Sequence, residues 1–443
     1  MTKKLLVFVM VLSFALIAAS PMAPMAGAFS GYTSGFQVQN LSASAANITI
    51  DYYNQDGSKA ISVPDTIAAS GAKTYYPIAA SAGFNGSVVI SSDQQIASVV
   101  NVLSTGSVKA GASYVAAMQG GTTVLLPLLM KNNGSSTIYN TWFNVQNAGT
   151  ADATVNVAYS DGTTAGPVTI KQGAAHTFDQ LSETHSVKVF SGTVTSTQPV
   201  AVAVIEESSI VMFAYSGFAG GVIHPVMPLI NANNSGYVTG IQMQNAGSSD
   251  TTVTVSYTHS SSGTDCTETQ TVSAGTSKTF ALAAFANGAN STCIAAAKFV
   301  GSATVTGNTA SQPLVAIVNQ LKTGVNGEAY GSFDPASATN TVVMPLIMDR
   351  NNGWFTGFNV MNVGSAPTTV SCTFTGTSYT LTTGSLAAGQ AYTANQNNQI
   401  ASSYVGSATC SATNPGDKIV AVVNEVKNGV AGDNLLVYEG INK

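Results

Sequence analysis

The stretch Phe358-Asn359-Val360-Met361-Asn362 decides the fold, because near-copies of it recur three more times at intervals of roughly 100 residues. Each copy alternates apolar and polar side chains and ends in asparagine, which is typical of a half-buried β-strand that runs into a turn. The recurrence predicts a chain built from one repeated unit. The other copies are Phe36-Gln37-Val38-Gln39-Asn40, Phe143-Asn144-Val145-Gln146-Asn147 and Ile241-Gln242-Met243-Gln244-Asn245.

Two further landmarks recur around each terminal asparagine. An aromatic residue stands eight positions before the asparagine, and further along a glycine opens the next strand. Landmarks that keep their order in every copy predict four repeats of the same local structure. The aromatic residues are Tyr32, Tyr139, Tyr237 and Trp354, and the glycines are Gly71, Gly173, Gly275 and Gly389.

The polarity within each copy predicts the fold class. Apolar and polar residues alternate with period two in short segments, which Gly, Asn and Ser separate. About seven or eight such strands in about 100 residues are the signature of an Ig-like β-sandwich, and units of this size can each bury a core. We therefore predict an all-β chain, a tandem array of four Ig-like sandwich domains after a cleaved signal peptide. The expected boundaries are 1–28 for the signal peptide and 29–121, 122–223, 224–338 and 339–443 for the repeats, like beads joined by short linkers.

The N-terminal segment has the pattern of an export signal. Lys3 and Lys4 precede an apolar run over residues 5–19, and Ala26-Gly27-Ala28 is a small-residue cleavage site that would leave Phe29 first. A membrane anchor is the competing interpretation, but the run is shorter than the ~18 residues a spanning helix needs. We expect a secreted, extracellular chain that is associated with the cell surface and has no membrane span after cleavage.

Composition and charge exclude several classes of protein. The chain has 443 residues, 15 Lys and Arg against 20 Asp and Glu, and only 8% charged residues. So few cations provide no footprint for nucleic acid, and we expect no nucleic-acid partner. The hydrophobic fraction of 45% and the small net charge of −5 argue against a disordered chain.

The four cysteines form two pairs within repeats: Cys266 with Cys293, and Cys372 with Cys410. An even number of cysteines in an exported chain predicts disulfides, and the absence of C-x-x-C spacing argues against a metal site. Alignment of the repeats places Cys372 opposite Val255 and Ile50, and Cys410 opposite Val305 and Ile90. We therefore expect Cys372–Cys410 to be a cross-sheet bridge in place of an apolar core pair, and Cys266–Cys293 to staple a loop.

No motif for catalysis, cofactor binding or metal binding stands out. The four histidines form no H-E-x-x-H pattern, and the sequence has no nucleophile elbow and no phosphate-binding loop. The adjacent acids Glu206 and Glu207 align with Asn319-Gln320 and Asn424-Glu425, which favours an ordinary strand over a catalytic dyad. We predict that the chain is not an enzyme.

Asparagine-rich loops before the landmark aromatic residues are the candidate ligand contacts. Their amide and carbonyl oxygens could bind sugar or calcium, and the aromatic residues Tyr32, Tyr139, Tyr237 and Trp354 could stack on glycans. The alternatives are hairpin turns that need positive φ and aromatic caps on the sandwich cores. The loop residues are Asn132, Asn133, Asn233, Asn234, Asn351 and Asn352.

Six sequons permit N-glycosylation. In a chain this rich in Asn, Ser and Thr, several arise by chance, so they do not by themselves predict a glycan. They begin at Asn40, Asn47, Asn85, Asn133, Asn233 and Asn290.

Repeats 2 to 4 each open with an apolar strand that contains a proline: Pro127, Pro228 or Pro345. Because proline cannot donate to a strand ladder, these strands should lie at sheet edges or bulges. The matching region of repeat 1 is 21–28, around Pro24, which cleavage would remove. Repeat 1 would then expose an edge that a strand of another chain could fill, with 435–438 as one candidate donor.

Two positions after the terminal asparagine stands Gly149, Gly247 or Gly364, with Ser42 in the first copy. This asparagine-x-glycine pattern and the glycine that opens a Thr-aromatic strand resemble the cell-adhesion-related Ig-like repeats of secreted bacterial surface proteins. The resemblance spans nearly all of residues 30–443 and implies an adhesive or structural extracellular role. We expect a non-enzymatic structural subunit of a surface layer, filament or sheath, which would form a homo-oligomer or polymer. The alternative is an adhesin or carbohydrate-binding module whose Asn-rich loops hold a cell-wall or surface glycan.

Overall fold

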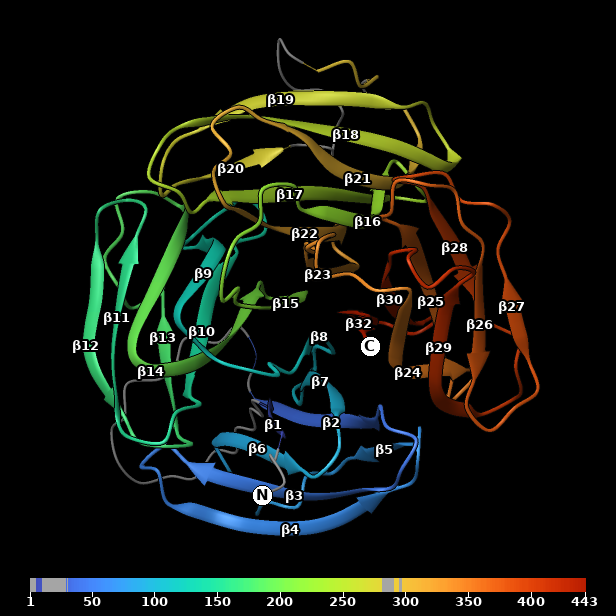
Figure 1. The fold of residues 1–443 in the computed structure, drawn as a ribbon. Coiled ribbons are helices and arrows are strands. Elements are labelled where there is room, and N and C mark those ends of the chain that lie inside the picture. The colour runs from blue at the N-terminus through green and yellow to red at the C-terminus, as the bar shows by residue number, and fades with distance from the viewer. Residues whose placement is uncertain (1–4, 10–28, 30, 281–290, 295–296) are drawn as a thin grey trace. The chain divides into compact units, whose positions relative to one another are not determined.

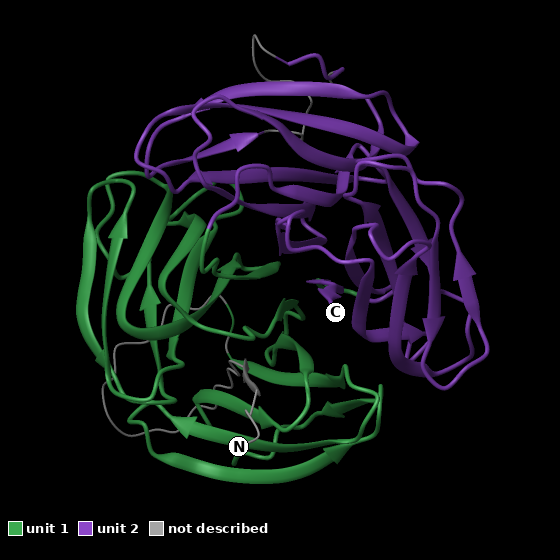
Figure 2. Cartoon of the chain, in the orientation of Figure 1, with its two compact units in different colours: residues 1–220, 431–433 green, residues 221–430, 434–443 purple. Residues whose placement is uncertain are grey.

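A computed structural model describes residues 5–9, 29, 31–280, 291–294 and 297–443 (Figure 1). Every regular element in this part of the chain is a β-strand, which confirms the all-β prediction. The chain divides into two compact units, residues 1–220 with 431–433 and residues 221–430 with 434–443 (Figure 2). Below, residues 29–121, 122–223, 224–338 and 339–443 are called repeats 1 to 4.

Repeat 1, together with a strand from the N-terminal segment, forms two antiparallel sheets of four strands each. The strands are β1 (Leu5–Val9), β2 (Tyr32–Asn40), β3 (Ala46–Asn54), β4 (Lys59–Ile67), β5 (Ala72–Tyr75), β6 (Gly86–Ser92), β7 (Ile96–Ser104) and β8 (Gly111–Val115). One sheet has the order β1-β6-β3-β4, and the other has the order β5-β2-β7-β8. The strand that carries the landmark Asn40, β2, therefore lies inside its sheet and is buried along most of its length.

Repeat 2 has the same strand pairs, but one long strand runs through both sheets. Its strands are β9 (Gly121–Met130), β10 (Asn140–Asn147), β11 (Ala153–Tyr159), β12 (Thr164–Ile170), β13 (Ala175–Asp179), β14 (Val189–Glu207) and β15 (Met212–Ser216). The first half of β14 pairs with β11 and β9, and its second half pairs with β10 and β15. All seven strands are consequently joined in one sheet.

Repeat 3 forms two four-stranded sheets, with the orders β16-β21-β18-β19 and β20-β17-β22-β23. Its strands are β16 (Val226–Ala232), β17 (Tyr237–Asn245), β18 (Thr251–Ser262), β19 (Cys266–Val272), β20 (Ser277–Phe280), β21 (Phe299–Asn308), β22 (Leu314–Lys322) and β23 (Asn326–Gly331).

Repeat 4 forms a five-stranded sheet, β27-β26-β29-β24-β32, and a four-stranded sheet, β28-β25-β30-β31. Its strands are β24 (Thr341–Asp349), β25 (Trp354–Asn362), β26 (Val370–Phe374), β27 (Thr380–Thr382), β28 (Ala391–Asn395), β29 (Tyr404–Ala412), β30 (Ile419–Lys427), β31 (Leu435–Glu439) and β32 (Ile441–Asn442). The expected donor strand 435–438 is thus already part of a sheet, where β31 pairs with β30.

The repeats are not separate beads, because neighbouring repeats within a unit share buried side chains. Trp142 and Ile205 of repeat 2 belong to the same apolar cluster as Phe36 and Ile50 of repeat 1. In unit 2, Val437 of repeat 4 belongs to the apolar cluster of repeat 3. The alternating pattern of a strand marks a residue as buried without telling which neighbour buries it, and this is why the expectation of independent cores was wrong.

The landmark asparagines fasten the turn that follows each of their strands. Asn362 is fully buried, and its Nδ2 donates to the carbonyl oxygens of Ala366 (2.8 Å) and Leu386 (2.9 Å). Its Oδ1 accepts a hydrogen bond from the backbone N–H of Gly364 at 2.9 Å. Asn40, Asn147 and Asn245 make the same three kinds of contact.

A buried tyrosine fastens the proline-containing strand in repeats 2 to 4. The Tyr438 hydroxyl donates to the carbonyl oxygen of Leu346 at 2.5 Å and accepts from the Leu346 N–H at 3.1 Å. Tyr215 with Leu128, and Tyr330 with Leu229, form the same pairs. Each of these leucines follows the proline and lies where the strand register shifts, which confirms that the prolines lie at bulges.

Both predicted disulfides are present, but one of them joins different elements from those expected. Cys372 on β26 and Cys410 on β29 are directly opposite each other on neighbouring strands of one sheet, with a Cα–Cα distance of 3.9 Å. The aligned pairs Val255–Val305 and Ile50–Ile90 are also neighbours within one sheet. The alignment of the two cysteines with these apolar pairs was therefore right. The prediction that the disulfide joins the two sheets of the sandwich was wrong, because both cysteines lie in the same sheet. Cys266 and Cys293 form the second disulfide.

The N-terminal segment supplies a strand to repeat 1. Leu5–Val9 pairs antiparallel with β6, from Leu5 opposite Ser92 to Val9 opposite Val88. The region around Pro24, which the sequence suggested for this place, lies outside the described residues. Among the residues described, no helix is long and apolar enough to cross a membrane.

Candidate functional site

The asparagine-rich loops of repeats 3 and 4 form tight hairpin turns. Asn351 and Trp354 bond to each other through their backbones, and Asn352 and Gly353 between them have φ of 51° and 87°. In repeat 3, Asn234 and Tyr237 enclose a turn in which Ser235 and Gly236 have φ of 53° and 87°. Asn and Gly tolerate this conformation best, so the backbone accounts for Asn352, Gly353 and Gly236 in these turns.

The corresponding loop of repeat 2 is longer. Asn133 and Tyr139 bond to each other through their backbones, and Asn132 has a φ of 50°. The side chain of Asn133 donates to Met130 Sδ at 3.2 Å. Asn351 likewise donates to Met348 Sδ, whereas Asn234 donates to Asn231 Oδ1. Of the six candidate asparagines, Asn132, Asn233 and Asn352 have exposed side chains.

Two of the candidate aromatic residues lie half-buried beside a lysine. Lys322 Nζ lies 5.5 Å from the ring centre of Tyr237, and Lys427 Nζ lies 6.0 Å from that of Trp354. The Tyr237 hydroxyl also donates to Asn326 Oδ1 at 3.0 Å. These partly exposed rings therefore each make a cation–π contact.

The aromatic residue of repeat 1 is in a different environment. Tyr32 is only 5% exposed, and its hydroxyl donates to Glu207 Oε2 at 2.6 Å. Its ring meets Trp142 edge-on at 5.8 Å. Burial and the Glu207 carboxylate raise the pKa of Tyr32. Tyr32 thus holds repeat 2 against repeat 1 and cannot stack on a ligand. In repeat 2, Tyr139 is half-buried and packs edge-on against Phe213.

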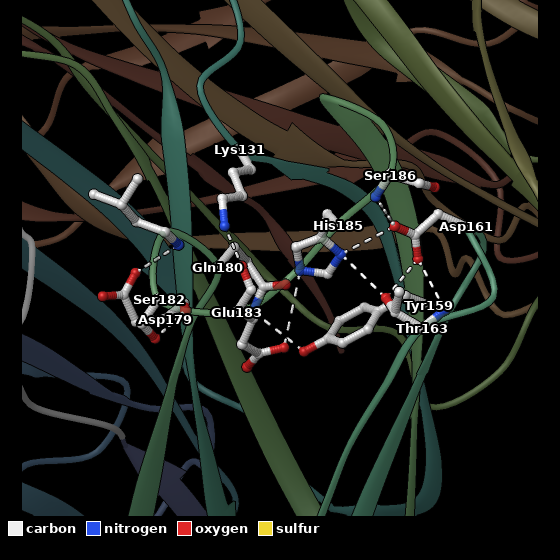
Figure 3. Close-up of polar contacts among 11 residues, drawn as sticks. Lys131, Tyr159, Asp161, Thr163, Asp179, Gln180, Ser182, Glu183, His185 and Ser186 are labelled. Carbon is white, nitrogen blue, oxygen red and sulfur yellow. Dashed lines mark hydrogen bonds and ion pairs between the residues drawn. The ribbon is translucent and has the colours of Figure 1, made fainter.

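Sequence reasoning did not find a polar cluster in repeat 2 (Figure 3). His185 Nδ1 lies 3.2 Å from Asp161 Oδ2, and its ring stacks on Phe190 with centres 4.0 Å apart. Asp161 also accepts hydrogen bonds from the Thr163 hydroxyl at 2.6 Å and the Ser186 N–H at 3.0 Å. The cluster thereby ties the loop after β13 to the β11–β12 turn.

The environment sets the charges in this cluster. Burial alone would raise the pKa of Asp161, but hydrogen bonds from Thr163, Ser186 and His185 lower it to about 2. Burial lowers the pKa of His185 despite the neighbouring carboxylate. Burial also raises the pKa of Glu183, whose backbone oxygen accepts from Lys131 Nζ. A neutral histidine beside an ionised aspartate is the state that this geometry favours at neutral pH.

Burial keeps Asp161 and His185 away from solvent and therefore from any substrate. The side chains of Asp161 and His185 have no exposed surface, so neither reaches a substrate in this conformation. A groove of about 720 Å³ lies beside the cluster and is lined by residues 163–165, 176–179 and 182–184. Its Thr and Ser hydroxyls and the carboxylates of Asp179 and Glu183 could hydrogen-bond a polyhydroxylated ligand. No group of three or more metal-binding side chains occurs in the described part of the chain.

The sequons differ in their access to a glycan-transferring enzyme. Asn40 is fully buried by its own turn, so the folded chain has no room for a glycan there. Asn47 and Asn233 are exposed, whereas Asn85 and Asn133 are partly exposed. Asn290 lies outside the described residues.

The sequence matches no protein-family model, and none of the curated proteins compared with it is similar. A functional assignment therefore depends on the residues of this chain.

Proposed function

We propose that this chain is a secreted, non-enzymatic structural protein of the cell surface, a subunit of a layer, filament or sheath. The observation that carries the proposal is that the recurring asparagines hydrogen-bond within the protein rather than face solvent. Asn40, Asn147, Asn245 and Asn362 all bond to the backbone of their own repeat. The asparagine that recurs in all four repeats thus stabilises the fold of its own repeat, which supports a structural role for the chain.

The disulfides and the low charge support the same role. Two disulfides, Cys266–Cys293 and Cys372–Cys410, suit an oxidising extracellular environment. A net charge of −5 over 443 residues gives copies little electrostatic reason to repel one another at close contact. Both features favour a stable homo-oligomer or polymer.

Electron microscopy of intact producing cells with gold-labelled antibody tests the cellular role. A continuous coat, or labelled filaments that salt washing does not remove, is the expected result. N-terminal sequencing of the extracted chain should begin near Phe29, because residues 1–28 have the pattern of an export signal. Label confined to the cell interior would contradict the proposal.

A glycan-binding adhesin is the second candidate, and two observations favour it. Trp354 and Tyr237 are half-buried rings beside exposed turns, and the groove of repeat 2 carries the hydroxyls and carboxylates that sugars need. The test titrates cell-wall polysaccharide while following Trp354 fluorescence in a Trp142→Phe background. A saturable change that Tyr237→Ala or Asn352→Ala weakens would favour the adhesin, and a flat signal would contradict stacking on Trp354.

A further inference from the structure

Strand β1 occupies the place that the proline-containing strand has in the other repeats. It pairs with β6, as β9 pairs with β14, β16 with β21, and β24 with β29. All four pairings are antiparallel. The first part of the apolar run of the predicted export signal, Leu5–Val9, is therefore also the first strand of repeat 1.

This position closes the sandwich core. In repeat 3, Met227, Ile230 and Ala232 of the equivalent strand are fully buried among the core side chains. In repeat 4, Met344 and Ile347 are fully buried in the same way. A repeat without this strand therefore lacks several core side chains and exposes both apolar surface and unpaired backbone groups.

Cleavage after Ala28 would remove β1 and leave β3 as the only strand paired with β6. At one end of β6, the Val88 carbonyl oxygen also accepts a hydrogen bond from Gln146 Nε2 of repeat 2 at 3.2 Å, so the newly open edge is chiefly residues 89–92. Strand β6 reads Gly-Ser-Val-Val-Ile-Ser-Ser over residues 86–92 and carries no charge. Val88 and Ile90 on it are fully buried while β1 is present. The exposed edge would then have no charged or proline residue of the kind that keeps natural edge strands apart.

We propose that removal of residues 1–28 turns β6 into an acceptor edge that a second copy of this chain fills through its own β6. The inference rests on the proposed secretion and assembly. A twofold axis between two β6 strands makes them antiparallel, as β1 and β6 are here, and joins the two sheets into one.

The chain itself points to a second copy as the occupant. Strands β9, β16 and β24, which have the required apolar sequence, are each already paired within their own repeat. Strand β31 is likewise held, by β30. Among the described strands, none of these candidates is thus left without a partner strand that repeat 1 could replace. Two identical open β6 edges, by contrast, can hydrogen-bond to each other through their backbones. Before cleavage, β1 covers the edge and blocks this contact.

The test compares the chain from Phe29 with the uncleaved chain, both produced in an oxidising cytoplasm, by analytical ultracentrifugation over a concentration series. At concentrations below those at which ordered assemblies form, we expect a dimer of the chain from Phe29 and a monomer of the uncleaved chain. A synthetic peptide of residues 3–11 should bind the chain from Phe29 and dissociate the dimer. The same peptide with Val7→Pro should not, because proline removes a ladder donor.

A matched pair of charge substitutions locates the contact. Ser91→Asp places a negative charge on the β6 edge of each copy and should weaken dimerisation at least about tenfold, because a charge on an edge strand disfavours pairing with another chain. Ser62→Asp adds the same charge to exposed β4, the opposite edge of the sheet, and should leave dimerisation unchanged. Circular dichroism checks that both variants fold.

A chain from Phe29 that stays monomeric and binds no peptide would overturn the inference, as would equal association of the uncleaved chain. A dimer that persists with saturating peptide would also overturn it. Ordered filaments that form regardless of the peptide would overturn the β6 contact while leaving the proposed structural role in place. Secretion without any self-association would contradict both the β6 contact and the proposed structural role.

Discussion

The Asn362 side chain donates a hydrogen bond of 2.9 Å to the backbone oxygen of Leu386, which lies 24 residues further along the chain. This contact closes the segment between β25 and β28, so one buried amide fixes the path of two intervening strands. The same relationship recurs as Asn147 with Ile170 and Asn245 with Val272. The asparagine that marks each repeat in the sequence is thus a structural clasp.

Replacement of Asn362 by alanine should lower the free energy of unfolding of repeat 4 by roughly 2 kcal/mol, because buried carbonyl oxygens lose their donor. In a Trp142→Phe background, Trp354 is the only tryptophan and reports on repeat 4 during urea unfolding. Asn397→Ala, at an exposed position of the same repeat, is the control and should cost under about 0.5 kcal/mol. Equal losses of unfolding free energy from the two substitutions would argue against a stabilising role for the Asn362 side chain.

Tyr438→Phe should destabilise repeat 4 by about 1–2 kcal/mol, since the hydroxyl bridges the N–H and the carbonyl oxygen of Leu346 within the core. Tyr392→Phe removes a hydroxyl from a partly exposed ring on β28 and is the matched control. The same fluorescence-detected unfolding measures both. A Tyr438→Phe variant as stable as the wild type would show that the bulge at Pro345 does not depend on the hydroxyl.

Cys372 and Cys410 occupy the place of the valine pair of repeat 3, so the double substitution to valine should keep the packing and lose only the covalent link. We expect a loss of about 2–4 kcal/mol for a loop of 38 residues. Reducing agent should destabilise repeat 4 of the wild-type chain and leave that of the double variant unchanged. A double variant as stable as the oxidised wild type would contradict this expectation.

Acid should weaken repeat 2 through Asp161. Its pKa is about 2 in the folded chain and near 3.8 when free, so the unfolded chain takes up the proton first as the pH falls. The stabilisation is present above about pH 4 and is lost between about pH 4 and pH 2. Asp161→Asn should flatten the stability curve of repeat 2 in this window, as followed by Trp142 fluorescence in a Trp354→Phe background. An unchanged slope would show that Asp161 does not stabilise the fold through its charge.

Local patterns in the sequence were enough to predict the strands and turns. The alternation around Val360, the positive φ at Asn352 and the bulge at Pro345 all depend on neighbouring residues, and the structure agrees with each prediction. The strand expected over 435–438 is β31.

Contacts between distant segments could not be predicted in the same way. Asp161 and His185 have no motif spacing, and the hydrogen bond from Tyr32 to Glu207 joins residues 175 positions apart. The sheet shared by Cys372 and Cys410 depends on strand order, which the period-two pattern does not encode. Strand β1 was missed because an apolar run of this kind has the same composition as a signal peptide and a buried strand.

The most direct test of the structural role is negative-stain electron microscopy of the chain that begins at Phe29, purified from the medium and imaged over a hundredfold range of concentration. The proposed role predicts ordered filaments or lattices whose amount rises with concentration. Separate particles of one chain at every concentration would contradict it.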